Sequence, residues 1–543
     1  MSNVSGNTGG LKTAQLRALD RLAGRRVSPD RIVSPELARE IAGMSFVLGR
    51  QIGVLIDRAG RVFEVVVGDH RGIMLPVLPQ IRGTGGRLKG LRCVHTHLAG
   101  EDLNDDDLMD LLFLRFDLMA MIKVDENGYP ERLYAAHLLP TPLAGRNWVF
   151  LDPVVPSQQT DNFLELINSL EQEFARVSPR LEVDGQQDRA ILISVTTLPR
   201  EVAEDSMAEL VELAGTAEVH VAETVIQRPR KINPRIIMGR GKLGEIMLKA
   251  LVNNANLLIF DQELSPSQIR SITDHTEMRV IDRTQLILDI FARRALSREG
   301  KLQIEMAQLK YLLPRLGTRD DALSRLTGGI GARGPGETKL EIDRRRIQER
   351  LAILARKLEQ VGRERHHRRS RRRKKDLPVI SLVGYTNAGK STLLNTLTHS
   401  QILAEDKLFA TLDPTSRRLR FPRDLEVVIT DTVGFIRDLP DELLLSFKST
   451  LEELHEADLL VHVIDLGNPA HSDQIRVVDD LLRELKLDTI PCLRVLNKID
   501  LVDPAFLDNL ARQLNGFPLS AMDSKTFGPF LDRAQDLIMK KIV

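Results

Sequence analysis

The stretch Gly384–Thr392, GYTNAGKST, constrains the fold of this chain more than any other part of it. An apolar run, Leu377–Val383, precedes it, and a run with helical character, Leu393–Leu397, follows it. In such a strand–loop–helix context the pattern G-x-x-x-x-G-K-[ST] forms a phosphate-binding loop. The pattern alone also fits a plain glycine turn before a helix, so the rest of the chain has to decide between the two.

The residue types in this loop suit phosphate chemistry. Gly384 and Gly389 let backbone N–H groups turn inward toward phosphate oxygens. Lys390 supplies a positive charge for the β- and γ-phosphates, and the Ser391 hydroxyl is placed to bind Mg²⁺.

Two further motifs fit a nucleotide triphosphate and its metal. Asp431-Thr432-Val433-Gly434 ends the apolar run Val427–Ile429, so it lies at the carboxyl end of a predicted strand. There Asp431 can reach the metal through water, and the Gly434 N–H can meet the γ-phosphate. The segment FATLD, residues 409–413, is predicted to lie in a loop in which Thr411 supplies a second oxygen to Mg²⁺.

Two more motifs fit recognition of the guanine base of a nucleotide. Asn497-Lys498-Ile499-Asp500 ends the predicted strand Cys492–Leu496. A carboxylate there accepts hydrogen bonds from the ring N–H and the exocyclic amine of guanine, a donor pair that adenine lacks. Ser520-Ala521 follows an apolar stretch and offers a backbone N–H to the guanine oxygen. Five motifs in this order predict that the chain binds GTP and GDP.

The predicted site is the sum of these motifs. We expect catalysis to depend on Lys390, Thr411, Asp431 and Gly434, and Mg²⁺ to bind Ser391 and Thr411. The predicted GTP-binding residues are Gly384, Tyr385, Thr386, Asn387, Ala388, Gly389, Lys390, Ser391, Thr392, Phe409, Ala410, Thr411, Leu412, Asp413, Asp431, Thr432, Val433, Gly434, Asn497, Lys498, Ile499, Asp500, Ser520 and Ala521.

Phe435 occupies the position directly after the glycine of the D-x-x-G motif. Many GTPases have a glutamine there that orients the attacking water. A phenylalanine side chain cannot hydrogen-bond to water. We therefore expect slow hydrolysis by the protein alone and strong stimulation by a partner.

Composition places the chain among cytoplasmic proteins. Its net charge is only +1, so no whole-molecule field favours nucleic acid. No apolar run approaches the roughly 20 residues that a membrane-spanning helix needs. Cys93 and Cys492, the two cysteines of the chain, lie in separate apolar runs. We expect both to be buried thiols in a reducing compartment.

At 543 residues the chain is too long for one core, and we expect an α/β multidomain protein. The predicted parts are an α+β amino-terminal extension (1–185), a small α/β domain (190–283), an antiparallel helical hairpin (284–375) and a P-loop GTPase domain (376–543). The linker 183–189 marks the first boundary. In the small domain, the basic glycine loop 238–242 opens a helix and is either an anion or RNA contact or a simple turn.

The predicted hairpin has features of an RNA-binding element. An uninterrupted helix is expected over Arg283–Leu313, and a second arm carries a matching apolar seam. The glycine-rich tip between them, 327–338, cannot pack a core of its own. The base of the hairpin, 363–375, is almost purely basic, which favours a polyanion such as RNA. The RNA-binding candidates are Arg333, Gly334, Arg344, Arg345 and Arg346.

The amino-terminal extension contains His95-Thr96-His97 at a predicted strand end, before a helix expected over Asp105–Leu118. This order weakly resembles the JAB/MPN fold, in which a His-x-His pair and a downstream aspartate bind zinc. The resemblance makes Asp107 the third ligand, but only Gln51 stands where that family has its catalytic glutamate. An active hydrolase, a structural zinc site and two histidines in an ordinary packing role all remain open.

The motifs GYTNAGKST, FATLDP, DTVGF and NKID, together with the tip GGIGARGPGETKLE, closely resemble the HflX family of ribosome-associated GTPases over residues 190–543. The resemblance implies binding to the large (50S) ribosomal subunit and its 23S rRNA, with the small domain and hairpin directed toward the peptidyl transferase centre. It also implies rescue or splitting of stalled ribosomes under stress. By matching position it makes Ser391 and Thr411 the Mg²⁺ ligands and Asn497 and Asp500 the guanine readers.

We expect a monomer. The alternative is a regulatory GTP switch that recruits a protein partner through a dimeric coiled coil. Use of ATP by the small domain is left open.

Overall fold

The computed structural model describes residues 4–75, 88–98, 101–143, 146–160, 162–177, 188–276, 278–316, 335–373, 377–398, 408–409, 415–421, 425–437 and 454–542. The chain forms two compact units. The first comprises Met1–Ala203 and Val219–Ile281, and the second comprises Glu204–Glu218 and Asp282–Val543. No helix in the described part of the chain is long and apolar enough to cross a membrane.

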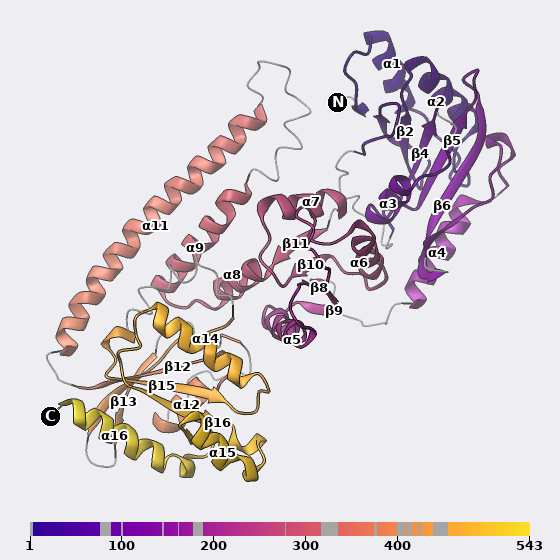
Figure 1. Cartoon of the computed structure of the whole chain (residues 1–543). Coiled ribbons are helices and arrows are strands. Elements are labelled where there is room, and N and C mark those ends of the chain that lie inside the picture. The colour runs from indigo at the N-terminus through magenta and orange to yellow at the C-terminus, as the bar shows by residue number, and fades with distance from the viewer. Residues whose placement is uncertain are drawn as a thin grey trace. The chain divides into compact units, whose positions relative to one another are not determined.

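The first unit contains a seven-stranded mixed sheet with the strand order β1-β3-β2-β4-β5-β6-β7 (Figure 1). β1 pairs with β3 and β4 pairs with β5 in parallel, and the other pairs are antiparallel. The strands are β1 (Val4–Gly6), β2 (Ile52–Asp57), β3 (Val62–Val67), β4 (Leu91–His97), β5 (Leu118–Val124), β6 (Pro130–Leu143) and β7 (Arg146–Phe150).

Four helices accompany this sheet: α1 (Thr13–Leu22), α2 (Pro35–Leu48), α3 (Asp105–Phe113) and α4 (Phe163–Val177). α2 begins as its sequence predicts, because the Ser34 side chain accepts a hydrogen bond from the Leu37 N–H. α3 ends earlier than Leu118, the end expected from the sequence. Arg115 adopts a left-handed conformation, with φ of 54°, and Leu118 already pairs with Arg92 as the first residue of β5.

A four-stranded sheet completes the first unit, in the order β11-β10-β8-β9. Its strands are β8 (Arg189–Val195), β9 (His220–Gln227), β10 (Leu257–Phe260) and β11 (Arg279–Asp282). β8 pairs in parallel with both β9 and β10, and α6 (Arg240–Val252) and α7 (Pro266–Thr276) connect the strands. α6 packs on α3: a methyl group on Gly244 would lie 3.0 Å from the Leu112 side chain.

Three long helices open the second unit. α5 (Arg200–Thr216) contributes its residues from Glu204 onward, and it continues through Gly215. The turn comes at Glu218, where φ is 61°. The helix expected over Arg283–Leu313 is two helices, α8 (Arg283–Arg294) and α9 (Arg298–Leu312), because Ala295 is extended and Ser297 caps α9 through the Gly300 N–H.

α11 (Pro335–Arg373) runs beside α9 (Figure 1), and Arg350 Nε donates to Glu305 Oε1 at 2.7 Å between them. Leu354 of the predicted apolar seam is fully buried. The apolar seam on α11 is therefore used within the chain.

The rest of the second unit is a six-stranded sheet, β13-β14-β12-β15-β16-β17, with helices α12, α14, α15 and α16 around it (Figure 1). Every pair is parallel except β13 with β14. The elements are β12 (Val379–Gly384), α12 (Lys390–Thr398), β13 (Thr415–Arg420), β14 (Glu426–Asp431), β15 (Leu459–Asp465), α14 (His471–Glu484), β16 (Cys492–Asn497), α15 (Pro504–Leu514), β17 (Gly516–Pro518) and α16 (Gly528–Ile542).

The structure confirms the predicted burial for one of the two cysteines. Cys93 is buried in β4, whereas Cys492, the first residue of β16, is exposed, so the prediction of two buried thiols is wrong for Cys492. Both are free.

Candidate active site

The parallel strands of the second unit carry the sequence motifs to one edge of the sheet. Asp431 ends β14, Gly384 ends β12 and Asn497 ends β16. Leu382 is opposite Asp431, and Asp465 is opposite Asn497, so these strand ends lie level with each other. Ligands of open α/β sheets bind at such an edge.

The phosphate-loop motif forms the turn between β12 and α12. Gly389 has a φ of +91°, and a methyl group placed on it would lie 2.2 Å from Asn497 Nδ2. Gly384 has a φ of +150°, and a methyl group there would lie 2.3 Å from the Val463 oxygen. Only glycine fits either position, because both the conformation and the close approach exclude a side chain.

Lys390 begins α12 inside this loop and is only 6% exposed. Its Nζ donates to the backbone oxygens of Gly384 at 3.0 Å and Tyr385 at 2.6 Å. Burial lowers the pKa of Lys390 to about 8, although the nearby Asp431 favours the charged form. The loop thus presents a desolvated cation that an anionic ligand would stabilise.

Ser391 and Asp431 provide the oxygen atoms that suit Mg²⁺. The Ser391 hydroxyl donates to Asp431 Oδ2 at 2.6 Å, and both residues are buried. A hydroxyl and a carboxylate are the hard oxygen donors that Mg²⁺ prefers, so this part of the site fits the ion. Thr411, the other predicted ligand, lies outside the described residues together with Ala410, Leu412 and Asp413.

The NKID motif joins two loops. Asn497 Nδ2 donates to the Ala388 oxygen, and Asn497 Oδ1 accepts from the Ala521 N–H, both at 2.8 Å. The side chain of Asn497 therefore ties the phosphate loop to the Ser520-Ala521 loop. The Ser520 hydroxyl donates to Asp500 Oδ1 at 2.9 Å and orients the carboxylate predicted to read guanine.

Phe435 is buried, with 2% of its surface exposed. Its backbone pairs with the phosphate loop: the Thr386 N–H donates to the Phe435 oxygen at 2.7 Å, and the Phe435 N–H donates to the Gly384 oxygen at 3.1 Å. The side chain offers no hydrogen bond to a water molecule.

Phe409 is one of the predicted GTP-binding residues, and the structure packs its side chain on α8. Its ring packs on Phe291 of α8, with the two ring centroids 4.5 Å apart, and it is 2% exposed. The Leu408 oxygen accepts from Arg294 at 2.9 Å. The start of this segment is thus packed on the preceding helices of the second unit.

The structure adds three residues around Tyr385 that sequence reasoning missed: Glu209, Arg283 and Arg437. The Tyr385 hydroxyl donates to Glu209 of α5 and accepts from the Arg437 N–H at 2.8 Å. Glu209 also pairs with Arg283 Nη2 at 2.5 Å. Burial, followed by the negative charge of Glu209, raises the pKa of Tyr385, so its hydroxyl remains a donor. The one signal in the sequence was a tyrosine inside a phosphate loop.

The RNA-binding candidates divide into two groups. Arg344, Arg345 and Arg346 are exposed on α11, where Arg346 lies 3.6 Å from Asp343 and Arg345 lies 3.8 Å from Glu349. Arg333 and Gly334 lie outside the described residues.

A parallel sheet with a glycine-framed phosphate loop, a buried loop lysine and a guanine-type motif at one edge defines a P-loop GTPase. Comparison with known proteins gives the particular family. Residues 204–292, 294–372 and 379–498 match family models described as GTP-binding GTPase N-terminal, GTP-binding GTPase Middle Region and 50S ribosome-binding GTPase.

Curated relatives named GTPase HflX match over most of their length. The protein of Caldanaerobacter subterraneus is 50% identical over 322 residues, which are 59% of this chain and 75% of the relative. The protein of Escherichia coli is 44% identical over 316 residues, 58% of this chain and 74% of the relative. The chain belongs to the HflX family and is a GTPase.

Among solved structures, a GTP-binding protein from Sulfolobus solfataricus in complex with GDP is similar to this chain. It is 26% identical with a TM-score of 0.36, covering 65% of this chain and 99% of that one.

Proposed function

We propose that this GTPase works on the large ribosomal subunit, and that its GTP cycle serves to split or rescue stalled ribosomes. Family membership and the description of the model matched by residues 379–498, a 50S ribosome-binding GTPase, support this partner. GTP binding is supported most directly by the phosphate loop. Its Lys390 is buried, and only glycine fits at positions 384 and 389.

Each motif takes one role in hydrolysis. Lys390 and the backbone N–H groups of the phosphate loop bind the β- and γ-phosphates, and Asp500 reads the guanine ring. Ser391 and Thr411 would hold Mg²⁺, which neutralises charge that develops on the phosphates. Water attacks the γ-phosphorus in line, the bond to the β–γ bridging oxygen breaks, and GDP and phosphate leave.

The rate of that attack depends on a partner. Phe435 is buried against the phosphate loop and cannot orient water, so the position that carries a glutamine in many GTPases does not assist the attack here. The ribosome supplies that help by ordering the loops or by lending a group.

The paired helices α9 and α11 direct the chain to ribosomal RNA. Arg344, Arg345 and Arg346 are exposed together on α11. Of the predicted tip 327–338, residues 327–334 lie outside the described residues, and from Pro335 onward the chain already belongs to α11. Such a basic element binds the RNA backbone through charge and shape. Because Leu354 is already buried within the chain, the apolar seam supports a monomer rather than the dimeric coiled coil.

Sedimentation with ribosomal subunits tests this proposal. Full-length protein with a non-hydrolysable GTP analogue should co-sediment with 50S subunits, and binding should weaken as salt increases. Deletion of residues 327–338 should abolish binding, and replacement of Arg344, Arg345 and Arg346 by glutamine should weaken it. Replacement of the exposed Arg476 and Arg483 of α14 is a matched control and should have no effect.

A chain that forms a dimer and ignores ribosomes at every salt concentration would contradict the proposal. That result would favour the regulatory switch.

A further inference from the structure

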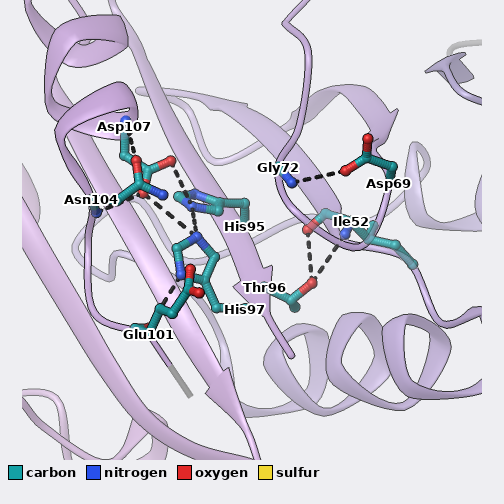
Figure 2. Close-up of polar contacts among 9 residues, drawn as sticks. All are labelled: Ile52, Asp69, Gly72, His95, Thr96, His97, Glu101, Asn104 and Asp107. Atoms are coloured by element: carbon teal, nitrogen blue, oxygen red, sulfur yellow. Dashed lines mark hydrogen bonds and ion pairs between the residues drawn. The ribbon is translucent and has the colours of Figure 1, made fainter. Parts of the chain in front are cut away.

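Three side chains with metal-binding atoms converge in the first unit, far in sequence from the GTP site. His95 and His97 lie at the end of β4, and Asp107 lies in the first turn of α3. Because side chains alternate along a strand, the two histidines share a face. Figure 2 shows both rings and the carboxylate pointing toward one another, with Thr96 on the opposite side of the strand.

The distances match one coordination sphere. The two Nε2 atoms are 3.0 Å apart, His95 Nε2 is 3.2 Å from Asp107 Oδ1, and His97 Nε2 is 3.5 Å from Asp107 Oδ2. Ligands about 2.0–2.1 Å from a tetrahedral zinc ion are about 3.3 Å apart. Two imidazoles and one carboxylate are also a ligand set that zinc uses.

The surroundings fix the ring of His97 in the form that binds a metal. His97 Nδ1 lies 3.2 Å from the backbone oxygen of Glu101. A carbonyl oxygen only accepts, so Nδ1 must carry the proton, and the Nε2 lone pair of a neutral ring points at the cluster. Such a contact from the other ring nitrogen is typical of metal-bound histidines.

The carboxylate is positioned in the same way. Asn104 caps α3, and its backbone N–H donates to Asp107 Oδ2 at 3.0 Å, while the Asp107 N–H donates back to Asn104 Oδ1 at 3.0 Å. This reciprocal cap holds Asp107 at the start of the helix, facing β4 (Figure 2). His95 is 0% exposed, His97 1% and Asp107 9%, so the cluster is shielded from bulk water.

The position beside β2 that faces His97 carries an amide, Gln51, and not an acid. Gly53 of β2 is opposite His95, so Gln51 falls one same-face step further along, toward His97. Gln51 is 2% exposed, and its Oε1 has no hydrogen-bond partner among the residues that the structure describes. An amide can hydrogen-bond to a metal-bound water but cannot take its proton, so Gln51 cannot act as a base at this position.

We propose that His95, His97 and Asp107 bind one divalent transition-metal ion, best matched by zinc, which fixes the start of α3 to the end of β4. The site is structural and independent of the GTP site.

Metal analysis of the full-length protein, purified without a histidine tag and loaded with zinc alone, tests this site. About one zinc per chain is expected after gel filtration. His97→Gln and Asp107→Asn should each lower the affinity for zinc by at least about tenfold. His137→Gln is the matched control, because His137 is also buried in this sheet but contacts the Leu138 oxygen outside the cluster. A wild-type chain without zinc, or variants that retain it fully, would overturn the proposal.

A second measurement on the unaltered protein covers the case in which a variant fails to fold. Cobalt(II) bound in place of zinc should give the absorption bands of a tetrahedral site, and zinc should abolish them by competition. Removal of zinc with a chelator should speed amide hydrogen exchange in Asp105–Phe113, while GTP hydrolysis stays unchanged and reports that the second unit remains folded. No cobalt bands, or exchange in α3 that is indifferent to zinc, would contradict the metal site or its structural role.

Discussion

Lys390 lies at the centre of the nucleotide site. Its ammonium group is removed from water and bonded to two carbonyl oxygens of its own loop. Two dipoles compensate only part of the lost hydration, so the charged form of the empty protein is destabilised. The phosphates of a bound nucleotide would restore that balance.

The burial of Lys390 predicts how the affinity for GDP depends on pH. In the empty protein the pKa of Lys390 is about 8, below the ordinary value, because of burial. Bound phosphates raise that pKa, so binding above pH 8 must take up a proton, and affinity must fall as pH rises. We expect the Kd for GDP to increase about threefold from pH 7.5 to 8.5, with uptake of about three quarters of a proton at pH 8.5.

Isothermal titration calorimetry in two buffers of different ionisation enthalpy measures the proton uptake directly. The diphosphate is fully ionised throughout this window, so its own titration does not contribute. Equal affinity at both pH values with no proton uptake would contradict the assignment of Lys390 as the buried phosphate-binding cation.

At the scale of elements, the Tyr385 hydroxyl links the phosphate loop to α5. Tyr385 donates to Glu209 and accepts from the N–H of Arg437, which is the third residue after Gly434 of the D-x-x-G segment. Tyr385→Phe removes both hydrogen bonds while it keeps the ring. Loss of a buried hydrogen bond costs about 1–3 kcal/mol, so the Arg437 amide should exchange with solvent at least about fivefold faster.

Hydrogen exchange measured by mass spectrometry over the Arg437 peptide provides the readout. Tyr311→Phe is the control, because it removes another buried hydroxyl of the second unit, which donates to Asp282. Exchange at Arg437 that is the same in Tyr385→Phe and in the wild type would show that this hydroxyl does not hold the segment.

The elements that follow a clear local pattern could be predicted from sequence. The motif-bearing strands end at Gly384, Asp431 and Asn497 as expected, and Ser34 caps α2 with Pro35 at its first position, a pattern that is visible in the sequence. Short-range signals are sufficient in these cases, because a cap or a glycine loop acts within a few residues.

Other features have a weak local signal or depend on distant contacts. The break between α8 and α9 has no proline or glycine before it, and its one local signal is the Ser297 cap at the start of α9. Glu209 and Tyr385 are 176 positions apart, so no local pattern links them. Likewise, Asp107 closes on the histidines only because α3 folds back beside β4.

At the scale of the whole molecule, the second unit joins a GTPase sheet to a pair of helices that carry exposed arginines. The sheet provides nucleotide binding, and its Phe435 leaves water without an orienting group. We propose that the helices provide a surface for RNA. We therefore propose that the protein hydrolyses GTP where its partner is, rather than in free solution.

The central claim is that hydrolysis depends on the ribosome. The most direct test is single-turnover GTP hydrolysis by the full-length protein, measured with and without purified 50S subunits. Partners that complete a GTPase site raise its rate by about 10³–10⁵, and we predict an increase of at least about a hundredfold here. An isolated chain that already hydrolyses GTP at the rate seen with saturating 50S subunits would contradict the account.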